Sequence, residues 1–465
     1  MNRFFFAACL FTTGWAFTSC GLFGSEKGFE RMAAAHTGIR FNNQITESDT
    51  FNVLRFEYIY NGGGVGVGDV NNDGLTDVFF AGNQVSSELY LNRGDFKFED
   101  VTGAAGVRTN RWCTGVAMAD VNQDGWLDIY VSTVHPRKDK SVPNLLFLNK
   151  GADAKGNVRF EEVAARVGLA DSTYATQAVF FDYDRDGDLD CYLLNNSLED
   201  YNRNQPVGQR TDGSGKSVDR LYQNTGTSAD GLPAFQDVSK QAGIQTEGWG
   251  LGVVVNDINQ DGWPDVYVAN DFLSNDHLWI NNRNGTFTNR IKQYFKHTEH
   301  NGMGVDIADI NNDGLNDVVA VDMMPDDNLR QKTMFSNTGY DRFFTNLRQS
   351  YQTQYVRNVL QLNNGPSPVA DSSGTPVTFS DIGYLAGIYA TDWSWSSLLA
   401  DFDNDGRRDL LITNGYRKDV TDLDFVTYSN DAAMFGTDET RLKRAIETVN
   451  KLEGVKKPNF LYRNR

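Results

Sequence analysis

The chain has 465 residues, which is enough for two or three ordinary domains or for one large repeat architecture. Hydrophobic residues make up 40% of the sequence and aromatic residues 12%, which is enough apolar material for a sizeable core. The formal net charge is −18, so bulk electrostatics argue against nucleic acid or an anionic membrane surface as a partner.

The first 20 residues have the pattern of an export signal. Arg3 is followed by an apolar run over 4–17, which is too short for a permanent membrane span. The small residues Thr and Ser directly before Cys20 resemble a bacterial lipobox, in which the cysteine is acylated. Phe17 departs from the usual aliphatic residue, so ordinary signal cleavage is the alternative. We expect a signal peptide over 1–20, lipidation at Cys20, and an exported protein in the outer membrane, in the periplasm or at the cell surface.

One nine-residue pattern, D-x-[D/N]-x-D-G-x-x-D, then occurs six times along the chain. The unequal spacing of the copies argues against a solenoid, whereas propeller blades tolerate loops of variable length. The copies are DVNNDGLTD (69–77), DVNQDGWLD (120–128), DYDRDGDLD (182–190), DINQDGWPD (257–265), DINNDGLND (309–317) and DFDNDGRRD (401–409).

Each copy lies between strand-like runs, and two further β-rich phrases follow it. Together these segments predict one four-stranded antiparallel sheet for each copy. The fold class is therefore an all-β propeller over 21–465 with six recognisable four-stranded blades, a seventh being possible in an insertion. Long insertions at 322–358 and 415–457 are expected to add helices, the second one capped by Thr437 and packed over a propeller face.

The two ends of the chain predict how the ring closes. The sixth unit ends inside its second phrase, NFLYRNR, and lacks a third. The segment FERMAAAHTGI (29–39) matches the missing phrase, so we expect it to form the outer part of that blade and to leave no open sheet edge.

The acidic loops predict calcium, because a tight turn with oxygen ligands at positions 1, 3, 5, 7 and 9 suits a hard cation. Glycine at position 6 permits the backbone reversal, and position 7 offers its carbonyl oxygen. The loops carry 21 of the 61 acidic residues, and such crowded carboxylates repel one another unless a cation neutralises them. Magnesium fits less well because it demands rigid octahedral geometry. We expect about six Ca²⁺ sites, with these ligands: Asp69, Asn71, Asp73, Leu75, Asp77; Asp120, Asn122, Asp124, Trp126, Asp128; Asp182, Asp184, Asp186, Asp188, Asp190; Asp257, Asn259, Asp261, Trp263, Asp265; Asp309, Asn311, Asp313, Leu315, Asp317; Asp401, Asp403, Asp405, Arg407, Asp409.

These repeats resemble the FG-GAP and VCBS repeats of integrin-α-type propellers. The phrases YNGGGVGVGDVNNDGL (60–75), FFDYDRDGDLDCYLLN (180–195) and DMMPDDNLRQK (322–332) make the chain most similar to bacterial lipoproteins related to cartilage acidic protein and the ASPIC/UnbV group. The resemblance implies a surface or periplasmic propeller used for adhesion, glycan handling or scaffolding. The resemblance also implies that such families usually have seven blades and often continue well beyond this length, with the ASPIC/UnbV domain at the far end.

The sequence favours a binding module over an enzyme. It contains no Gly-x-Ser-x-Gly elbow and no Cys-x-x-Cys pair, and the His297–His300 motif is expected in a solvated or packing role. Cys113 and Cys191 lie in strand-like runs that predict burial, with a disulfide between them as the alternative. We therefore expect a calcium-stabilised module for a glycan or protein ligand. The alternative function is a polysaccharide lyase or hydrolase.

The residue eight places before each acidic loop marks a candidate ligand face. Four of these six residues are large aromatics, and the residues five places before the loop are mostly small. The aromatics are expected around one mouth of the axial channel. They either wedge between neighbouring blades or form a stacking platform for sugar rings. The residues are Asn61, Trp112, Tyr174, Trp249, Asn301 and Trp393.

Overall fold

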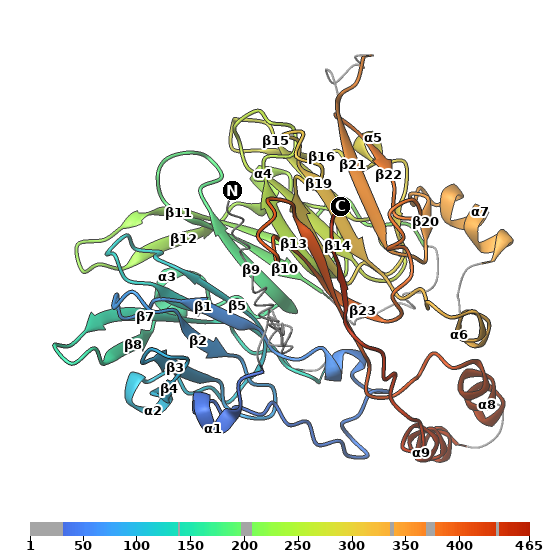
Figure 1. The fold of residues 1–465 in the computed structure, drawn as a ribbon, viewed down its shortest axis with the longest axis horizontal. Coiled ribbons are helices and arrows are strands. Elements are labelled where there is room, and N and C mark those ends of the chain that lie inside the picture. The colour runs from blue at the N-terminus through green and yellow to red at the C-terminus, as the bar shows by residue number, and fades with distance from the viewer. Residues whose placement is uncertain (1–30, 138–139, 197–206, 335–338, 369–376, 434–436) are drawn as a thin grey trace, which may run out of the picture.

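A computed structural model describes residues 31–137, 140–196, 207–334, 339–368, 377–433 and 437–465. Six antiparallel sheets fan out around a common axis, which confirms the predicted β-propeller (Figure 1). The predicted signal peptide and the lipid site at Cys20 lie outside the described residues. No helix in the described part of the chain has the length and apolar character needed to cross a membrane.

Each acidic loop joins the first and second strands of its sheet, as the repeat pattern predicts. Five sheets have four strands, and the sixth has three within the described residues. The blades are, in order, β1 (Val65–Gly68), β2 (Asp77–Phe80), β3 (Glu88–Asn92) and β4 (Phe98–Asp100); β5 (Trp112–Ala119), β6 (Asp128–Val134), β7 (Leu145–Ala152) and β8 (Val158–Glu162); β9 (Ala175–Phe181), β10 (Asp190–Asn195), β11 (Arg220–Thr227) and β12 (Pro233–Asp237); β13 (Gly250–Asn256), β14 (Asp265–Asn270), β15 (His277–Asn281) and β16 (Phe287–Asn289); β18 (Gly304–Ala308), β19 (Asp317–Val321), β21 (Val359–Pro366) and β22 (Val377–Asp381); β23 (Ser394–Ala400), β24 (Asp409–Asn414) and β25 (Phe460–Tyr462).

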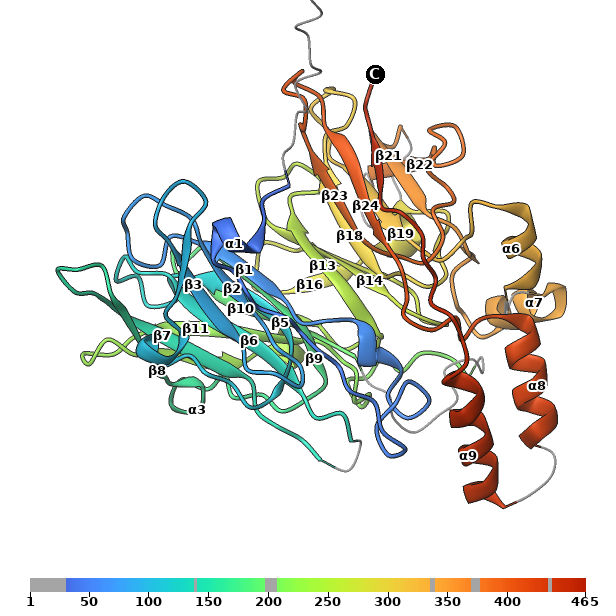
Figure 2. The same cartoon turned by 60° about the horizontal axis from the view of Figure 1, so that its bottom comes forward.

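The helices are short where they follow an outer strand and longer in the two insertions. The four helices of the two insertions lie together beside the propeller, as predicted (Figure 2). The helices are α1 (Ala34–Thr37), the 3-10 helix η1 (Glu57–Tyr60), α2 (Thr102–Ala105), α3 (Ala164–Val167), α4 (Ser239–Ala242), α5 (Ile291–Tyr294), α6 (Asn328–Thr333), α7 (Tyr340–Arg348), α8 (Leu423–Ala433) and α9 (Asp438–Val449); the short strands β17 (Thr298–Glu299) and β20 (Gln354–Tyr355) pair in parallel. Thr437 caps α9 by accepting a hydrogen bond from the backbone N–H of Thr440, as expected.

The buried apolar side chains gather between blades. In the described residues, a cluster lies at each of the five junctions between consecutive blades. Cys113 and Cys191 belong to two different junctions and are free, buried thiols, so their role is packing. A further cluster joins α9 and residues 53–60 over one mouth of the channel.

Two repeated hydrogen bonds connect each blade to the next. The fourth residue of a hairpin donates to the carbonyl oxygen of the glycine in the next hairpin. An asparagine in the third strand, or just after it in blade six, donates to the carbonyl oxygen of the residue that follows the first aspartate of the preceding hairpin. The first series is Asn72–Gly125, Gln123–Gly187, Arg185–Gly262, Gln260–Gly314 and Asn312–Gly406, and the second is Asn149–Val70, Asn224–Val121, Asn281–Tyr183, Asn363–Ile258 and Asn464–Ile310.

Neither series continues from blade six to blade one within the described residues. Asn404 holds the fourth position of the sixth hairpin and makes no such bond, and Asn92 bonds Thr76 of its own blade instead. Residues 42–61 bridge this junction: Asn43 bonds Asn83 of blade one, and the salt bridge of Glu47 with Lys418, 2.5 Å long, reaches the insertion of blade six.

The predicted closure by residues 29–39 is wrong for the part that the structure describes. α1 packs on blade one, where His36 bonds the carbonyl oxygen of Asp95. A Cβ atom on Gly38 would lie 2.6 Å from the carbonyl oxygen of Phe98, just as one on Gly168 would lie 2.3 Å from that of Phe235 in the following blade. The helix after an outer strand thus packs on the next blade, so α1 holds the place before blade one. Within the described residues the sheet of blade six contains only β23, β24 and β25, so residues 31–39 add no strand beside β25.

The sheet faces on both sides of this junction carry exposed apolar side chains. Val65 and Val67 of β1 are 57% and 63% exposed. Val116 and Met118 hold the same positions in blade two, but there the side chains are partly covered because they pack on Gly66 of blade one. On blade six, Leu461 is 56% exposed. The residues that match Leu461 in the other blades are buried: Leu89, Leu146, Leu221, Leu278 and Leu360.

We expect these faces to cause concentration-dependent self-association of the chain, because contiguous apolar surface and an open strand edge favour contact with a second copy. The double variant Leu398→Lys, Leu461→Lys should shift sedimentation-velocity profiles towards the monomer. Leu385→Lys, at an 87% exposed leucine, is the control and should leave the profile unchanged. A wild-type chain that stays monomeric at high concentration would contradict the expectation.

Candidate metal sites and the axial cavity

The hairpin loops fold the aspartates inward before any cation is considered. In the third hairpin, Asp182 accepts hydrogen bonds from the backbone N–H groups of Asp186 and Gly187, both at 3.1 Å. Gly187 has a φ of 96°, in the left-handed region that glycine tolerates. The position-4 residue also has a positive φ, 62° at Arg185, and directs its side chain to the next hairpin. The loops therefore both turn their carboxylates inward and link neighbouring blades.

The ninth residue of each loop anchors the loop to the sheet. Asp190 is fully buried, and its two oxygens accept hydrogen bonds from the backbone N–H groups of Tyr183 at 3.1 Å and Asn224 at 2.8 Å. The same two bonds recur in the other hairpins, from Val70 and Asn92 to Asp77, Val121 and Asn149 to Asp128, Ile258 and Asn281 to Asp265, Ile310 and Asn363 to Asp317, and Phe402 and Asn464 to Asp409. This residue is thus both a candidate ligand and a structural pin.

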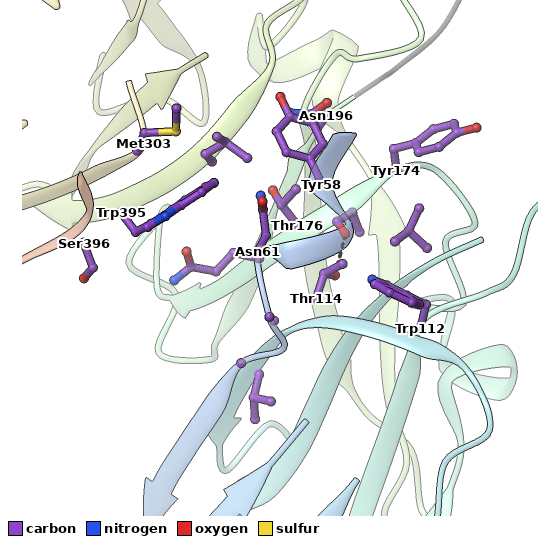
Figure 3. A pocket seen from close by; sticks show the side chains of 18 of the residues that line it. Tyr58, Asn61, Trp112, Thr114, Tyr174, Thr176, Asn196, Met303, Trp395 and Ser396 are labelled. Atoms are coloured by element: carbon purple, nitrogen blue, oxygen red, sulfur yellow. Dashed lines mark hydrogen bonds between the residues drawn. The ribbon is translucent and has the colours of Figure 1, made fainter. Parts of the chain in front are cut away.

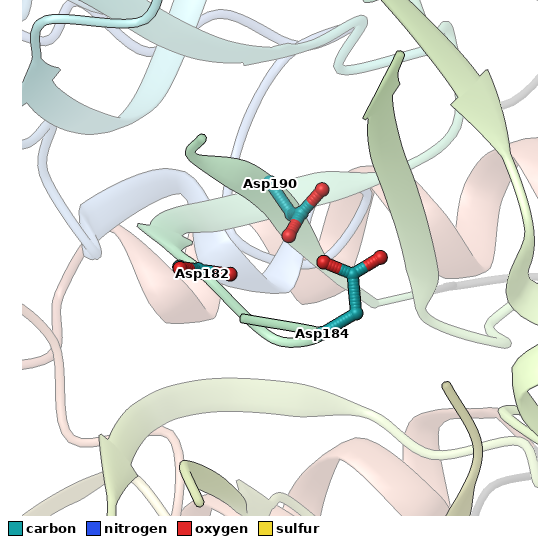
Figure 4. Close-up of side chains that lie close together, drawn as sticks. All are labelled: Asp182, Asp184 and Asp190. Carbon is teal, nitrogen blue, oxygen red and sulfur yellow. The ribbon is translucent and has the colours of Figure 1, made fainter. Parts of the chain in front are cut away.

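Two hairpins bring three carboxylates together. One oxygen from each of Asp182, Asp184 and Asp190 lies within 4.8 Å of the others, and the same holds for Asp401, Asp403 and Asp409 (Figure 4). The other hairpins have asparagine at position 3, and its Nδ2 donates to the position-5 aspartate, as in Asn71 to Asp73 at 3.0 Å. These clusters supply the oxygen donors that a hard cation requires, and their residues fit the predicted metal.

Burial and mutual repulsion make these carboxyls hard to ionise without a cation. Burial raises the pKa of Asp190 to about 8, against the lowering effect of its two backbone hydrogen bonds, and Asp184 and Asp188 raise it further. Burial likewise raises the pKa of Asp128 and of Asp265 to about 7, and that of Asp77 and of Asp317 to about 6. A bound divalent cation would reverse this cost.

A third acidic cluster, Asp326, Asp327 and Asp392, is already neutralised. Lys457 lies 2.7 Å from Asp326 and 2.9 Å from Asp327, and Arg330 lies 2.7 Å from Asp392. Ammonium and guanidinium groups here take the place of a metal ion, so this cluster ties the two insertions together.

A cavity of about 460 Å³ lies on the axis where the inner strands begin, at the end away from the acidic hairpins (Figure 3). Aromatic side chains and small polar side chains line it. None of its described lining residues is Asp, Glu, His, Lys or Arg. The cavity therefore suits an uncharged ligand, and a strand length of roughly 20 Å separates the cavity from the acidic clusters.

Five of the six predicted ligand residues divide between two cavities, and Trp249 lines neither of them. Asn61, Trp112 and Tyr174 line the axial cavity, whereas Asn301 and Trp393 line a neighbouring, more apolar cavity of about 330 Å³. Tyr58, Met303 and Trp395 lie between the two, because they line both.

The three predicted indoles are buried and are covered by other segments. Trp112, Trp249 and Trp393 are 6%, 4% and 7% exposed. Trp112 packs edge-on against Phe51 and Phe56, and Trp393 stacks on Tyr416 with ring centroids 4.1 Å apart. The exposed platform is therefore wrong for these three side chains, because the chain covers them with its own aromatics rather than leaving them to solvent. Trp112 and Trp393 also do not wedge between neighbouring blades. The aromatic partners of Trp112 lie in residues 42–61, and the partner of Trp393 lies in the insertion 415–457.

Sequence reasoning missed the residues six places before each acidic loop. Thr114, Thr176, Leu251, Met303 and Trp395 hold this position in blades two to six, and all of them line the axial cavity. These residues lie two places after the predicted aromatics along each inner strand. Because alternate residues of a strand share a face, the same count continued by two places would have found them. The small residues five places before the loop have another role: a Cβ atom on Gly115 would lie 2.5 Å from the carbonyl oxygen of Thr176 in the next inner strand.

Asn196 is a further cavity residue that the repeat pattern did not indicate. Its Nδ2 donates to the hydroxyl of Tyr58 at 3.2 Å, and its Oδ1 is buried without a hydrogen-bond partner within the described residues. Tyr58 in turn donates to Asp271 at 2.8 Å. The cavity wall thus offers a fixed acceptor to a ligand hydroxyl.

Comparisons with known proteins agree with the repeat assignment. A family model described as FG-GAP-like repeat matches residues 69–131 and 257–320. Cartilage acidic protein 1 of Homo sapiens is 28% identical over 212 residues, covering 45% of this chain and 28% of that protein. The Xenopus tropicalis protein is 27% identical over 212 residues, covering 45% and 29%. The matched part of the chain thus spans less than a third of these relatives.

Solved structures share the fold only loosely. An Agrocybe aegerita lectin that recognises non-reducing terminal N-acetylglucosamine is 17% identical, with a TM-score of 0.37 over 86% of this chain and 85% of the lectin. The V. cholerae biofilm matrix protein Bap1 is 16% identical, with a TM-score of 0.31 over 56% of this chain and 34% of Bap1. At these TM-scores neither likeness bears on ligands. The repeats, the relatives and the blades together make this chain a β-propeller with FG-GAP-like repeats that resembles the cartilage acidic proteins.

Proposed function

We propose that this chain is a calcium-stabilised, extracytoplasmic binding module that holds a neutral glycan in its axial cavity. The observation that carries the proposal is the lining of that cavity, which combines aromatic faces with neutral hydroxyl and amide groups and has no charged side chain among its described residues. Aromatic faces suit the C–H faces of sugars, and amides suit their hydroxyls. Export and acylation at Cys20, supported by the first 20 residues, belong to the same proposal.

Calcium has a structural role in this proposal. The acidic hairpins lie at the far end of the inner strands from the cavity, so a bound ion stiffens the ring without touching the ligand. Asp182, Asp184 and Asp190 would hold one ion, and the matching residues of the other five hairpins would hold the rest.

The alternative function, a polysaccharide lyase or hydrolase, requires a general acid or base beside the sugar. The described lining of the axial cavity supplies only tyrosine hydroxyls as titratable groups, and burial raises the pKa of Tyr58 well above its usual range. A binding role therefore fits this cavity better than catalysis.

A glycan array followed by calorimetry on the best ligand tests the proposal. Asn61→Ala should weaken binding about tenfold, because one hydrogen bond to a sugar hydroxyl contributes about 1 to 1.5 kcal/mol. Asn404→Ala, an exposed asparagine at the hairpin end, is the matched control and should bind like the wild type. Failure to bind any glycan, or equal binding by Asn61→Ala, would refute the assignment, and release of reducing ends would favour the enzyme.

A further inference from the structure

A third cavity, of about 260 Å³, lies between α7 and the strand β20. Its lining is His300, Gly339, Tyr340, Arg342, Phe343, Asn346, Gln354, Tyr355 and Val356. His300 and Val356 also line the apolar cavity next to the axial one, so the three cavities follow one another on the same side of the ring.

Four polar atoms of this lining are buried without a hydrogen-bond partner within the described residues. They are Nδ1 of His300, Nε of Arg342, Oδ1 of Asn346 and Oε1 of Gln354. His300 and Gln354 are more than nine-tenths buried. The amide of Gln354 is held in place because its Nε2 donates to the carbonyl oxygen of Ser274 at 2.6 Å, which leaves Oε1 as an acceptor. Buried polar atoms in proteins normally have partners, so a cavity lined by four such atoms indicates a ligand.

Arg342 is unlike the other buried arginines of the same region. Arg357 lies 2.5 Å from Asp381, and Arg330 lies 2.7 Å from Asp392. Arg342 has no carboxylate partner within the described residues, although it is partly buried and lies close enough to His300 to disfavour the protonated imidazole. A partly desolvated guanidinium without a counter-charge attracts an anion, and its planar fork matches a carboxylate.

The walls of the cavity supply the remaining chemistry of a sugar ring. Phe343 and Tyr355 lie nearly parallel, with ring centroids 6.4 Å apart and an interplanar angle of 20°. Such faces pack against C–H groups, and the amide oxygens of Asn346 and Gln354 can accept hydrogen bonds from hydroxyls. The volume is below the range of drug-sized pockets and suits one monosaccharide.

We propose that this cavity binds a carboxylate-bearing monosaccharide of the uronic acid class, with Arg342 on the carboxylate and Asn346 and Gln354 on the hydroxyls. The site is separate from the axial cavity and takes a charged sugar where the axial cavity takes a neutral one. It does not depend on the function proposed for the axial cavity.

Calorimetry with D-glucuronate and D-galacturonate tests the site, with glucose and acetate as comparison ligands. At least one uronate should bind, and both glucose and acetate should bind at least tenfold more weakly. Glucose lacks the carboxylate that Arg342 would bind, and acetate lacks the hydroxyls that Asn346 and Gln354 would bind. Arg342→Gln should raise Kd at least tenfold and Arg342→Lys by less, since an ammonium keeps the charge but loses the fork. Arg348→Gln, an exposed arginine at the end of the same helix, should bind like the wild type.

Three outcomes would overturn the proposal. The first is that neither uronate binds, which would mean that water fills the cavity. The second is equal binding by wild type and Arg342→Gln, with the variant shown to be folded by its melting curve. The third is that acetate binds as tightly as a uronate, which would leave an anion site without sugar recognition. Asn61→Ala should retain uronate binding, which separates this test from that of the axial cavity.

Discussion

Removal of calcium with EDTA should lower the melting temperature of the protein, and added calcium should restore it. The affinity expected for an extracellular module is about 0.1 to 1 mM per site, so 10 mM calcium should stabilise the fold by about 1.4 to 2.7 kcal/mol per occupied site. The effect is large because each of the first five hairpins bonds the next one, so the six sites act on one connected series of blades. Differential scanning calorimetry with elemental analysis measures both quantities.

The pH dependence of this effect has a definite sign. The folded pKa values of Asp190 and Asp128, about 8 and about 7, lie above the unfolded value for aspartate. The metal-free folded state therefore binds more protons than the unfolded state between about pH 4 and pH 8, and its stability should fall as pH rises through this window. Calcium must displace those protons, so its stabilising effect should be larger at pH 8 than at pH 5. An identical melting curve with and without calcium at pH 8, with no metal bound, would contradict the metal assignment.

The second large effect should come from the ninth residue of a hairpin. Asp190→Ala should reduce the free energy of unfolding by about 2 to 6 kcal/mol, because it leaves the buried N–H groups of Tyr183 and Asn224 without acceptors, at about 1 to 3 kcal/mol each. Urea unfolding in EDTA measures this loss apart from any effect of the cation.

Asp186→Ala is the matched control in the same hairpin. Asp186 is exposed and accepts a hydrogen bond only from Asp188 within its own loop, so this variant should lose one metal site but keep wild-type stability in EDTA. Equal stability of the two variants in EDTA would show that the ninth aspartate serves the metal alone and is not a structural pin.

The repeat pattern predicted the six blades because a β-hairpin is a local structure. Alternating apolar residues, an Asp-Gly turn and a second strand lie within about 20 residues, so the sequence alone fixes their pairing and register. The helix after Thr437 is equally local, since its cap and its first turn are neighbours in sequence. The acidic clusters could be predicted for the same reason, because the carboxylates of each cluster belong to one hairpin.

The ligand side chains were harder to predict, because burial depends on segments far away in sequence. Trp112 and Trp393 hold the same position before their hairpins, the second and the sixth. Even so, Trp393 is covered by Tyr416, whereas Trp112 is covered by Phe51 and Phe56. No spacing within a repeat shows which insertion folds over which blade. Arg342 lies outside the repeats altogether, and its lack of a counter-charge is visible only once α7 lies beside β20.

The sequence by itself determined the six recognisable blades, the position of each acidic hairpin and the order of the strands, because these depend on contacts between near neighbours along the chain. The tertiary structure decided the junction between blades six and one, where α1 packs on blade one and residues 42–61 bridge to Lys418. It also decided which faces stay exposed there and which side chains line the cavities. Contacts of this kind join residues up to hundreds of positions apart, as Tyr416 bonds Glu57, and only the packing of the folded chain brings them together.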